Sequence, residues 1–186
     1  MHPDEAPVVL LDDQHRPIGT VPKSQVHGTD TPLHLAFSCY VFDGAGRLLL
    51  TRRAPGKRSF PGVWTNTCCG HPLPGEDPAD AARRRLAEEL GLRLERAAVV
   101  LPDFAYRAVA ADGLVENEVC PVLVATAAGS PDPDPAEVVE HRWEDWATVV
   151  DVVRSAPWAV SPWAALQVPQ LDDLGPAPWR LLERVA

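Results

Sequence analysis

The feature that most constrains this chain is a set of fixed spacings between residues 68 and 92. Residues 68–71 read Cys-Cys-Gly-His, a carboxylate follows at Glu76, and residues 84–92 read Arg-Arg-Leu-Ala-Glu-Glu-Leu-Gly-Leu. Two thiols, an imidazole and several carboxylates therefore lie in one short segment. A packed core does not need such a set, whereas a metal site beside an acid or base residue does.

The second half of this segment carries the signals of a helix. Asp77 is a suitable N-cap and Gly91 a suitable stop, so we expect a helix from Asp77 to Leu90. Arg85 and Glu89 are four residues apart and lie on one face of that helix. Such charges ordinarily belong to a solvated helix with surface ion pairs, but the complete spacing of the segment favours a functional role.

Length and charge limit the possible partners of the chain. At 186 residues with 46% hydrophobic residues, it suits a single domain, residues 1–186, with a full core. Its formal net charge of −9 leaves no dominant basic surface, so we expect no nucleic-acid partner. An anionic ligand would need a local basic pocket, and the only two lysines are Lys23 and Lys57.

The sequence also bears on the compartment. It has no run of eighteen apolar residues, so we expect no membrane span. The first residues lack the basic start and apolar stretch of a signal peptide, which favours the cytoplasm. The four cysteines, Cys39, Cys68, Cys69 and Cys120, are then expected to be reduced. We expect a monomer.

Hydrophobic patterning and turn residues predict the elements of the fold. Strands are expected at 8–11, 18–21, 33–42, 47–53, 64–69, 99–107, 115–126 and 139–143. Helices are expected at 77–90, 145–155, 161–168 and 177–185. Antiparallel hairpins flanked by helices predict an α/β (α+β) fold, an α/β/α sandwich with a mixed sheet.

A second group of residues has the composition of a metal site. Glu116 and Glu118 are two residues apart in a strand pattern, so both project from one face. Two adjacent carboxylates repel each other unless a cation or a shared proton lies between them. With His27, His34 and His71 they form a ligand set suited to Mn²⁺, Mg²⁺ or Zn²⁺. A lone histidine, however, is more often a surface or core residue, and by sequence alone His27 would be read so.

The segment 70–92 resembles the Nudix box, Gly-x5-Glu-x7-Arg-Glu-U-x-Glu-Glu-x-Gly-U, in which U is a bulky apolar residue. Every fixed position matches except one, because Arg85 stands where the box has a glutamate. A longer resemblance, from about residue 8 to about residue 163, is to type 1 isopentenyl-diphosphate delta-isomerases, a Nudix branch that isomerises rather than hydrolyses. It rests on 29–38, 50–54, 106–108, Thr-Asn-Thr-Cys-Cys-Gly-His-Pro at 65–72, Glu-Asn-Glu-Val-Cys-Pro at 116–121 and Pro-Trp-Ala-Val-Ser-Pro-Trp at 157–163.

This resemblance implies a Nudix-like sandwich with a loop-helix-loop, and it implies roles for individual residues. A Mn²⁺ or Zn²⁺ site would be formed by His27, His34, His71, Glu116 and Glu118, and Glu89 would hold a Mg²⁺ joined to the substrate diphosphate. Cys69 and Glu118, with Tyr106 beside the latter, would be catalytic. Substrate would contact Lys23, Arg53, Lys57, Cys69 and Trp163. Cys68 is read as a small buried residue.

The implied reaction moves the double bond of isopentenyl diphosphate reversibly to give dimethylallyl diphosphate through a tertiary carbocation. One proton is added at the terminal methylene and another is removed two carbons away, so two groups on opposite faces are needed. We favour Glu118 as proton donor and Cys69 as proton acceptor in the forward direction. The face of Trp163 would stabilise the cation, although a packing tryptophan is the plain alternative.

Two other functions compete with this interpretation. The first is a Nudix hydrolase of a nucleoside or other diphosphate. Arg85 in a catalytic glutamate position and a cysteine that hydrolysis does not use count against it. The second is a diphosphate-binding domain without catalysis, which the presence of Cys69, Glu118 and Tyr106 disfavours.

Overall fold

The computed structural model describes residues 5–184, so the first residues, on which the expected cytoplasmic location depends, lie outside it. The strands are β1 Pro7–Leu11, β2 Pro17–Pro22, β3 His34–Leu35, β4 Phe37–Val41, β5 Arg47–Arg53, β6 Trp64–Thr65, β7 Cys68–Gly70, β8 Arg93–Leu101, β9 Ala105–Val109, β10 Val115–Val119, β11 Val122–Ala128 and β12 Val138–Asp145. The helices are α1 Lys23–Val26, α2 Pro78–Leu90, α3 Trp146–Ser155 and α4 Pro162–Asp173, with 3-10 helices η2 Pro157–Ala159 and η3 Pro178–Arg184.

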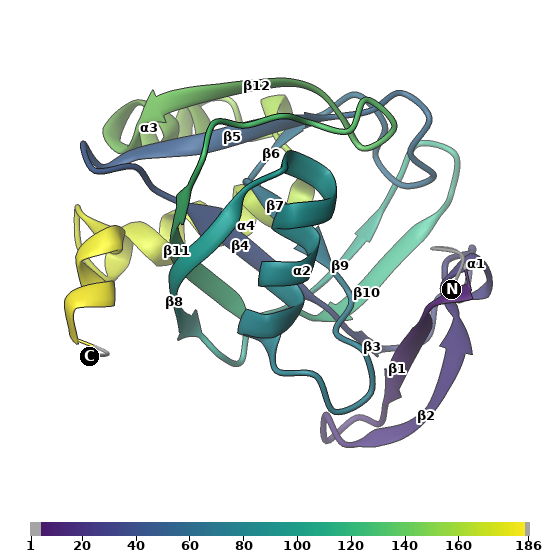
Figure 1. The fold of residues 1–186 in the computed structure, drawn as a ribbon. Coiled ribbons are helices and arrows are strands. Elements are labelled where there is room, and N and C mark those ends of the chain that lie inside the picture. Colours follow the sequence, from purple (N-terminus) through teal and green to yellow (C-terminus); the bar gives the residue numbers. More distant parts are fainter. Residues whose placement is uncertain (1–4, 185–186) are drawn as a thin grey trace.

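The middle layer is a four-stranded sheet in the order β7-β4-β11-β8. Because side chains alternate along a strand, the two faces of β4 pack against different helices. Phe37 and Cys39 pack with Leu86 of α2, whereas Tyr40 packs with Val168 of α4 on the opposite face. Figure 1 shows α2 in front of this sheet and α4 behind it. The expected α/β/α sandwich is therefore confirmed.

The remaining strands form two further sheets rather than extending the first. A five-stranded sheet has the order β2-β1-β3-β10-β9, and a three-stranded sheet has the order β12-β5-β6. The parallel pairs β3–β10 and β4–β11 make the first two sheets mixed, as expected, while the third is antiparallel. The division into three sheets corrects the expectation of one mixed sheet.

Two neighbouring chain segments pass together from the five-stranded sheet into the four-stranded sheet. The first goes from β3 through Ala36 into β4, and the second goes from β10 through residues 120–121 into β11. Main-chain hydrogen bonds continue between them through the crossing, because the Ala36 N–H donates to Val119 O at 2.9 Å and the Ser38 N–H donates to Pro121 O at 3.0 Å. The two sheets are therefore joined by a continuous ladder.

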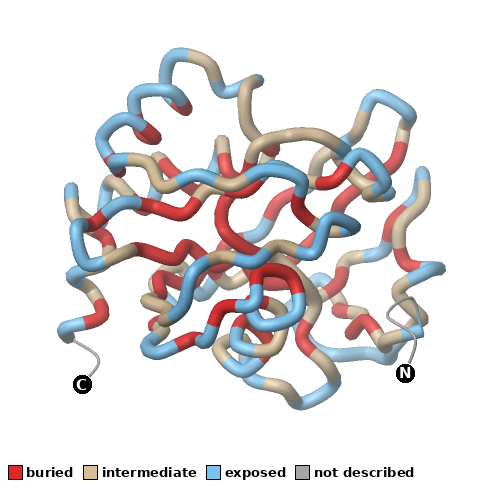
Figure 2. Tube along the Cα trace, turned by 45° about the horizontal axis from the view of Figure 1, so that its top comes forward, coloured by how far each residue is buried: buried red, intermediate tan, exposed pale blue. Residues whose placement is uncertain are grey.

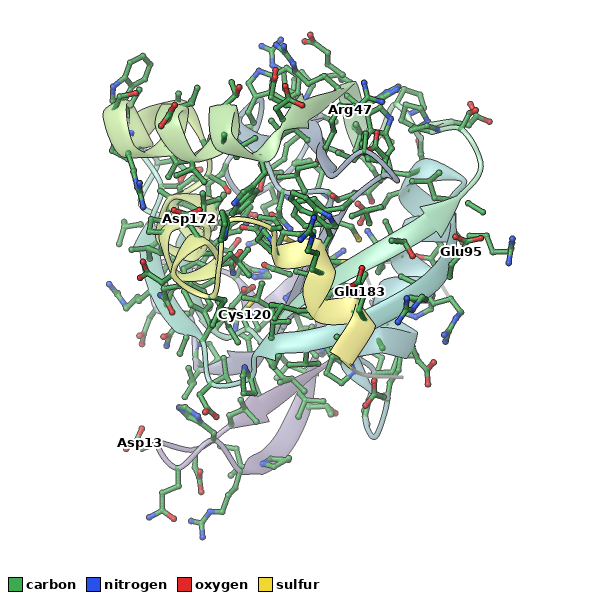
Figure 3. The ribbon with its side chains drawn as sticks, turned by 90° about the vertical axis from the view of Figure 1, so that its left-hand side faces the viewer. Asp13, Arg47, Glu95, Cys120, Asp172 and Glu183 are labelled. Atoms are coloured by element: carbon green, nitrogen blue, oxygen red, sulfur yellow. The ribbon has the colours of Figure 1, made fainter. Side chains whose placement is uncertain are left out.

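The periphery of the molecule is formed by hairpins and turns. The β1–β2 hairpin extends from the five-stranded sheet, and Figure 3 shows Asp13 at its far tip. Buried stretches lie in the interior and exposed stretches along the outline (Figure 2). Among residues 5–184, no helix is both long and apolar enough to cross a membrane.

Helix α2 has the ends that its sequence predicts. The Asp77 carboxylate accepts a hydrogen bond from the Ala79 N–H at 2.8 Å, which satisfies one free donor of the first turn. Gly91 ends the helix in the left-handed region, with φ 62°, and its N–H donates to Ala87 O at 3.2 Å. The expected span of 77–90 is confirmed within one residue.

Several other expected bounds are wrong. The expected strand 99–107 is divided between β8, which starts at residue 93, and β9, and the expected strand 115–126 breaks at Pro121. A proline N has no hydrogen to donate to a ladder, which suits it to this break. Residues 64–69 form β6 and part of β7 with a gap between them. The last expected helix, 177–185, is the 3-10 helix η3, and residue 185 lies outside the described part.

Candidate active site

A cavity of about 700 Å³ opens between the five-stranded and four-stranded sheets and α2. Glu118 and Tyr106 line it from β10 and β9, Cys69 lines it from β7, and Trp163 lines it from α4. The structure brings nearly the whole predicted site to this one cavity. Its lining includes His27, His71, Glu116, Glu118, Glu89, Lys23, Arg53, Lys57, Cys69, Tyr106 and Trp163. His34 lies behind this wall, within the cluster described next.

At one end of the cavity three histidines meet two glutamates. The ring centroids of His27, His34 and His71 are 5.1–5.5 Å apart. His27 Nε2 lies 2.9 Å from Glu116 Oε2, and Glu118 Oε1 lies 3.4 Å from His34 Nε2 and 3.6 Å from His71 Nε2. One potential ligand atom from each histidine and from Glu118 falls within 4.8 Å of all the others.

The backbone explains why these five residues converge. Glu116 and Glu118 project from one face of β10, and β3 runs beside that strand with His34 paired to Glu118. His27 directly follows α1, and His71 directly follows β7. Strand pairing therefore fixes two of the four elements that carry the cluster, β3 and β10, before any ligand binds.

The cluster is chemically incomplete without a cation. In the described part of the chain, four buried polar side-chain atoms have no hydrogen-bond partner, and all belong to this cluster: Nε2 of His27, His34 and His71, and Oε2 of Glu116. Buried polar atoms nearly always have a hydrogen-bond partner, so four such atoms without one, grouped in a single cluster, require an explanation. Imidazole nitrogens and carboxylate oxygens at this separation suit a divalent metal ion.

The charges of the cluster also suit metal binding. Burial lowers the pKa of His71 to about 4, so its ring is neutral near pH 7 and its nitrogen lone pair is free. Burial alone would raise the pKa of Glu118, but His34 and His71 hold that pKa well below its usual range. The Pro32 carbonyl lies 2.9 Å from Nδ1 of His34, which leaves Nε2 facing the cluster.

Cys69 and Cys68 have opposite environments because they are adjacent in a strand. The Cys69 thiol faces the cavity, donates to Asn66 Oδ1 at 3.2 Å and lies 3.4 Å from Ser38 Oγ. Burial raises its pKa to about 11, so it is a neutral thiol near pH 7. Cys68 packs with Leu86 and other apolar residues of the α2 face. Both cysteines contribute to the cavity wall, but only the Cys69 thiol has hydrogen-bond partners among polar side chains there, Asn66 and Ser38.

Aromatic rings form the wall between the thiol and the carboxylates. The ring centroids of Tyr106 and Trp163 are 6.0 Å apart, and Tyr106 pairs with Glu118 across β9 and β10. The guanidinium carbon of Arg53 lies 5.4 Å from the Trp163 ring centroid. The π-face of Trp163 is therefore near both a cation of the chain and the space beside Cys69.

Another part of the cavity wall is rich in cations. Lys23, Arg53 and Lys57 all line the cavity. Burial lowers the pKa of Lys23, and the nearby positive charges of Arg85 and Lys57 lower it further. Positive charges that repel one another in this way favour the binding of an anion, because the anion relieves the repulsion.

Glu89 and Glu137 partly neutralise these cations. Arg85, four residues before Glu89 on α2, forms an ion pair with it, and also lies 3.5 Å from Glu137. Lys57 forms a further ion pair with Glu137. Glu89 therefore lies beside these cations and not in the His/Glu cluster.

Sequence reasoning missed three residues of this site, Glu137, Ser38 and Asn66. Nothing in the sequence around Glu137 distinguishes it from other acidic loop residues. Asn66 does carry a signal, because it lies in a run of three polar residues, 65–67, within a segment expected to be a buried strand. Buried polar side chains need partners, so such a run predicts a hydrogen-bond network.

Comparison with known proteins places the chain among named relatives. A family model described as NUDIX domain matches residues 32–168. A Frankia alni protein named isopentenyl-diphosphate Delta-isomerase is 66% identical over 161 residues, which are 87% of this chain and 83% of that protein. A Mycolicibacterium vanbaalenii protein of the same name is 61% identical over 168 residues, 90% of this chain and 92% of the relative.

Solved structures show the same fold at low identity. A Deinococcus radiodurans crystal structure superposes with a TM-score of 0.67 at 16% identity, covering 88% of this chain and 98% of the other. A MutT protein from Methanosarcina mazei gives a TM-score of 0.56 at 14% identity, over 76% of this chain and 94% of that one. These likenesses concern the arrangement of strands and helices alone.

Proposed function

This chain belongs to the isopentenyl-diphosphate Delta-isomerase family within the NUDIX fold, and we propose that it carries out the reaction with Cys69 and Glu118 as its proton-transfer groups. It interconverts isopentenyl diphosphate and dimethylallyl diphosphate. The observation that supports these roles best is that both side chains line one cavity from different sheets.

The chemistry requires two groups because one proton arrives as another leaves. In the forward direction Glu118 donates a proton to the terminal methylene, and a tertiary cation develops at the neighbouring carbon. Cys69, reacting as its thiolate, then accepts the proton lost from the carbon on the diphosphate side, which forms the new double bond. Because burial favours the neutral thiol of Cys69 and the histidines favour the carboxylate of Glu118, one proton has to pass from Cys69 to Glu118 before each forward turnover. The roles exchange in the reverse direction. The aromatic faces of Trp163 and Tyr106 lie beside this space and stabilise the developing positive charge.

The diphosphate binds at the cationic end. Lys23, Arg53 and Lys57 offer positive charge around it, and the ion pair of Lys57 with Glu137 compensates part of that charge in the absence of substrate. The small hydrocarbon then extends toward Cys69 and Glu118. An acidic protein can bind a strongly anionic substrate in this way because the field that matters is local.

We also propose two divalent cations. His27, His34, His71, Glu116 and Glu118 would hold Mn²⁺ or Zn²⁺, and Glu89 would hold Mg²⁺ together with the diphosphate. When bound, these ions supply positive charge that fixes the carboxylates and neutralises the phosphates. The four orphaned polar atoms of the cluster support the first ion, and the position of Glu89 at the basic end supports the second.

Hydrolysis of a diphosphate is the main alternative, and Arg85 argues against it. At the position where the Nudix box has a glutamate, its guanidinium pairs with Glu88 at 2.9 Å and with Glu89. A carboxylate at residue 85 would add a metal ligand, whereas a guanidinium adds a cation that competes with metal for Glu89. The side chains of α2 therefore favour binding of the diphosphate and do not favour activation of a water molecule for hydrolysis.

The test compares substrates and adjacent cysteines. With Mg²⁺ and Mn²⁺ present, the wild-type protein should convert isopentenyl diphosphate to dimethylallyl diphosphate, and should release no phosphate from nucleoside diphosphates. Cys69→Ala should lower kcat by roughly 10²–10⁴-fold, while the matched variant Cys68→Ala should retain turnover. Phosphate release without an allylic product would reject the proposal, and a larger loss in Cys68→Ala would relocate the thiol.

We further propose that the enzyme acts as a monomer in the cytoplasm. The candidate metal-binding and proton-transfer residues of a single chain already meet around one cavity, which supports a complete site within one copy. Size-exclusion chromatography with light scattering should give a mass near the 20.2 kDa of one chain. A stable dimer would contradict this part of the proposal.

A further inference from the structure

Asn66 is a fully buried polar residue that the reaction described above does not use. It lies between β6 and β7, and its side chain is enclosed by the protein. A buried amide that did not form hydrogen bonds would destabilise the fold, so its partners reveal what it is for.

Every hydrogen-bonding group of the Asn66 amide is used. Its Nδ2 donates to Cys39 O at 3.0 Å and to Cys68 O at 2.9 Å, which fixes the amide plane on the main chain of β4 and β7. Its Oδ1 accepts from Thr65 Oγ1 at 2.8 Å, from Trp163 Nε1 at 2.9 Å and from Cys69 Sγ at 3.2 Å. Three donors therefore meet at one oxygen atom.

The hydrogens around this oxygen can be assigned. Because Thr65 donates to Asn66, its own oxygen accepts from the Ser161 hydroxyl, which lies 2.8 Å away. Ser161 is also the N-cap of α4, where its oxygen accepts from the Ala164 N–H at 3.3 Å. The start of α4 is thus tied through Thr65 to the Asn66 oxygen, independently of the Trp163 indole.

The two other donors at this oxygen are the groups that line the hydrocarbon part of the cavity. Cys69 comes from β7 and Trp163 from α4, elements that are distant in sequence and belong to different layers. A single atom, held rigidly by two main-chain carbonyls, sets the distance and angle between the thiol and the indole.

From this geometry we propose that Asn66 is a positioning residue, which holds the Cys69 thiol and the Trp163 ring in a fixed relation around the substrate hydrocarbon. The inference rests on the proposed roles of Cys69 and Trp163. Asn66 does not touch the reacting carbons, and its hydrogen bonds go to Cys39, Cys68, Thr65, Trp163 and Cys69 and to none of Lys23, Arg53 and Lys57. It should therefore act on the chemical step much more than on substrate binding, since small misplacements of reacting groups lower rates steeply.

The first test separates kcat from KM. Asn66→Ala should lower kcat by roughly tenfold or more and change KM by less than about threefold. Thr67→Val is the matched control: it is nearly isosteric and deletes a buried hydroxyl that accepts from Val41 N and donates to Leu49 O, and that forms no hydrogen bond with Asn66, Cys69 or Trp163. This control should keep kcat within about twofold of wild type.

The second test reads the indole directly and does not depend on turnover. In protein labelled with ¹⁵N-tryptophan, the Trp163 indole N–H resonance is assigned by its loss in Trp163→Phe. Asn66→Ala should shift this resonance and speed its exchange with solvent, because the hydrogen bond is lost. Thr67→Val should leave it in place. A residue that served only general stability would move neither the resonance nor the ratio of kcat to KM.

A third variant keeps the proposal testable if Asn66→Ala does not fold. Thr65→Val removes one of the three donors and the tie to α4, and should lower kcat by about threefold to tenfold with KM unchanged. The proposal is overturned if a folded Asn66→Ala, or Thr65→Val in its absence, keeps wild-type kcat and the wild-type indole resonance. Absence of isomerase activity in the wild-type protein would instead reject the proposed function, and the two failures are thus distinct.

Discussion

Glu137, which directly precedes β12, lies among the cations that we propose bind the diphosphate. It forms ion pairs with Lys57 and Arg85 at the edge of the cavity, and these neighbours lower its pKa below the usual range despite its burial. An incoming diphosphate would compete with Glu137 for the same positive groups. Glu137 therefore balances the positive charge of the site when no substrate is bound, and this lowers the affinity for substrate.

Removing this competitor should strengthen substrate binding. Glu137→Gln should lower the KM for isopentenyl diphosphate by about fivefold, which corresponds to an ion pair of about 1 kcal/mol, with little change in kcat. Steady-state kinetics measure this. Glu140→Gln is the control, because Glu140 pairs with the exposed Arg52 at 3.3 Å and should leave KM unchanged. A higher KM in Glu137→Gln would mean that this carboxylate orients Lys57 for the substrate.

The residues of the site differ in how far the sequence predicts them. Glu116 and Glu118 follow from a two-residue period in a strand, and the cavity contains both. The convergence of His27 on them depends on how the β1–β2 hairpin folds back, which no local pattern encodes. The resemblance supplied that residue. Glu137 pairs with Lys57, which is 80 residues away in the sequence, and Asn66 pairs with Trp163, which is 97 residues away. Local periodicity does not reveal either pairing.

At the scale of elements, α2 and the loop before it act as one unit. The Arg84 guanidinium binds the Glu76 carboxylate with both ends, Nε to Oε1 at 3.0 Å and a terminal nitrogen to Oε2 at 2.8 Å. The Glu76 carboxylate also accepts from the Leu73 N–H at 2.8 Å. The loop is thereby fastened to the helix that presents Arg85 and Glu89 to the cavity.

This fastening should be visible in the pH dependence of stability. Arg84, chiefly through its hydrogen bonds, lowers the pKa of Glu76 in the folded protein. The stabilisation is therefore fully present above the unfolded value of about 4.3 and is lost as the pH falls through the folded pKa. Glu76→Gln should cost about 2 kcal/mol at pH 7, and the difference from wild type should shrink below pH 4. Urea denaturation at several pH values measures this, and a pH-independent difference would contradict it.

The C-terminal end of α2 offers a second test. Gly91 has φ 62°, and a Cβ there would lie 3.3 Å from Cβ of Asp132. Gly91→Ala should therefore destabilise the protein by about 1–2 kcal/mol. Gly44→Ala is the control, because Gly44 lies outside the left-handed region and a Cβ there meets open space. Thermal unfolding of both variants measures this. Equal unfolding midpoints for Gly91→Ala and Gly44→Ala would argue against strain at Gly91.

The strength of local signals explains which elements the sequence predicts. Helix α2 has a cap, a stop and an apolar stripe, and its bounds are right. The run 33–42 is largely apolar, with polar residues at His34 and Ser38, and predicts one strand, yet its two halves, β3 and β4, belong to different sheets. An apolar run predicts that a strand is buried, but it does not predict which neighbouring strand it pairs with. The switch at Ala36 is decided by tertiary pairing with β10 and β11.

At the scale of the whole molecule, the His/Glu cluster connects distant parts of the chain. Its side chains come from the residue after α1, from β3 and β10, and from the residue after β7. A cation bound there would hold the N-terminal hairpin region, the five-stranded sheet and the four-stranded sheet together. Binding to the folded state alone stabilises it by mass action.

Metal removal should therefore lower the melting temperature. At a thousandfold excess over Kd, a bound ion contributes about 4 kcal/mol, which for a chain of this size corresponds to a Tm decrease of roughly 8–16 °C in excess chelator. Differential scanning calorimetry with and without chelator, followed by readdition of Mn²⁺, measures this. In Glu116→Gln the decrease should be much smaller. An unchanged Tm in the wild-type protein would show that the cluster holds no structural ion.

The paired crossing of β3–β4 and β10–β11 has a consequence for chain-length selectivity. The thiol and the carboxylate stand on sheets that the same hydrogen-bonded ladder joins through Ala36 and Pro121. Widening the gap between these two walls would require breaking that ladder. Room for a ten-carbon tail would consequently have to come from side chains outside the ladder, such as Trp163 of α4, and not from separation of the two sheets.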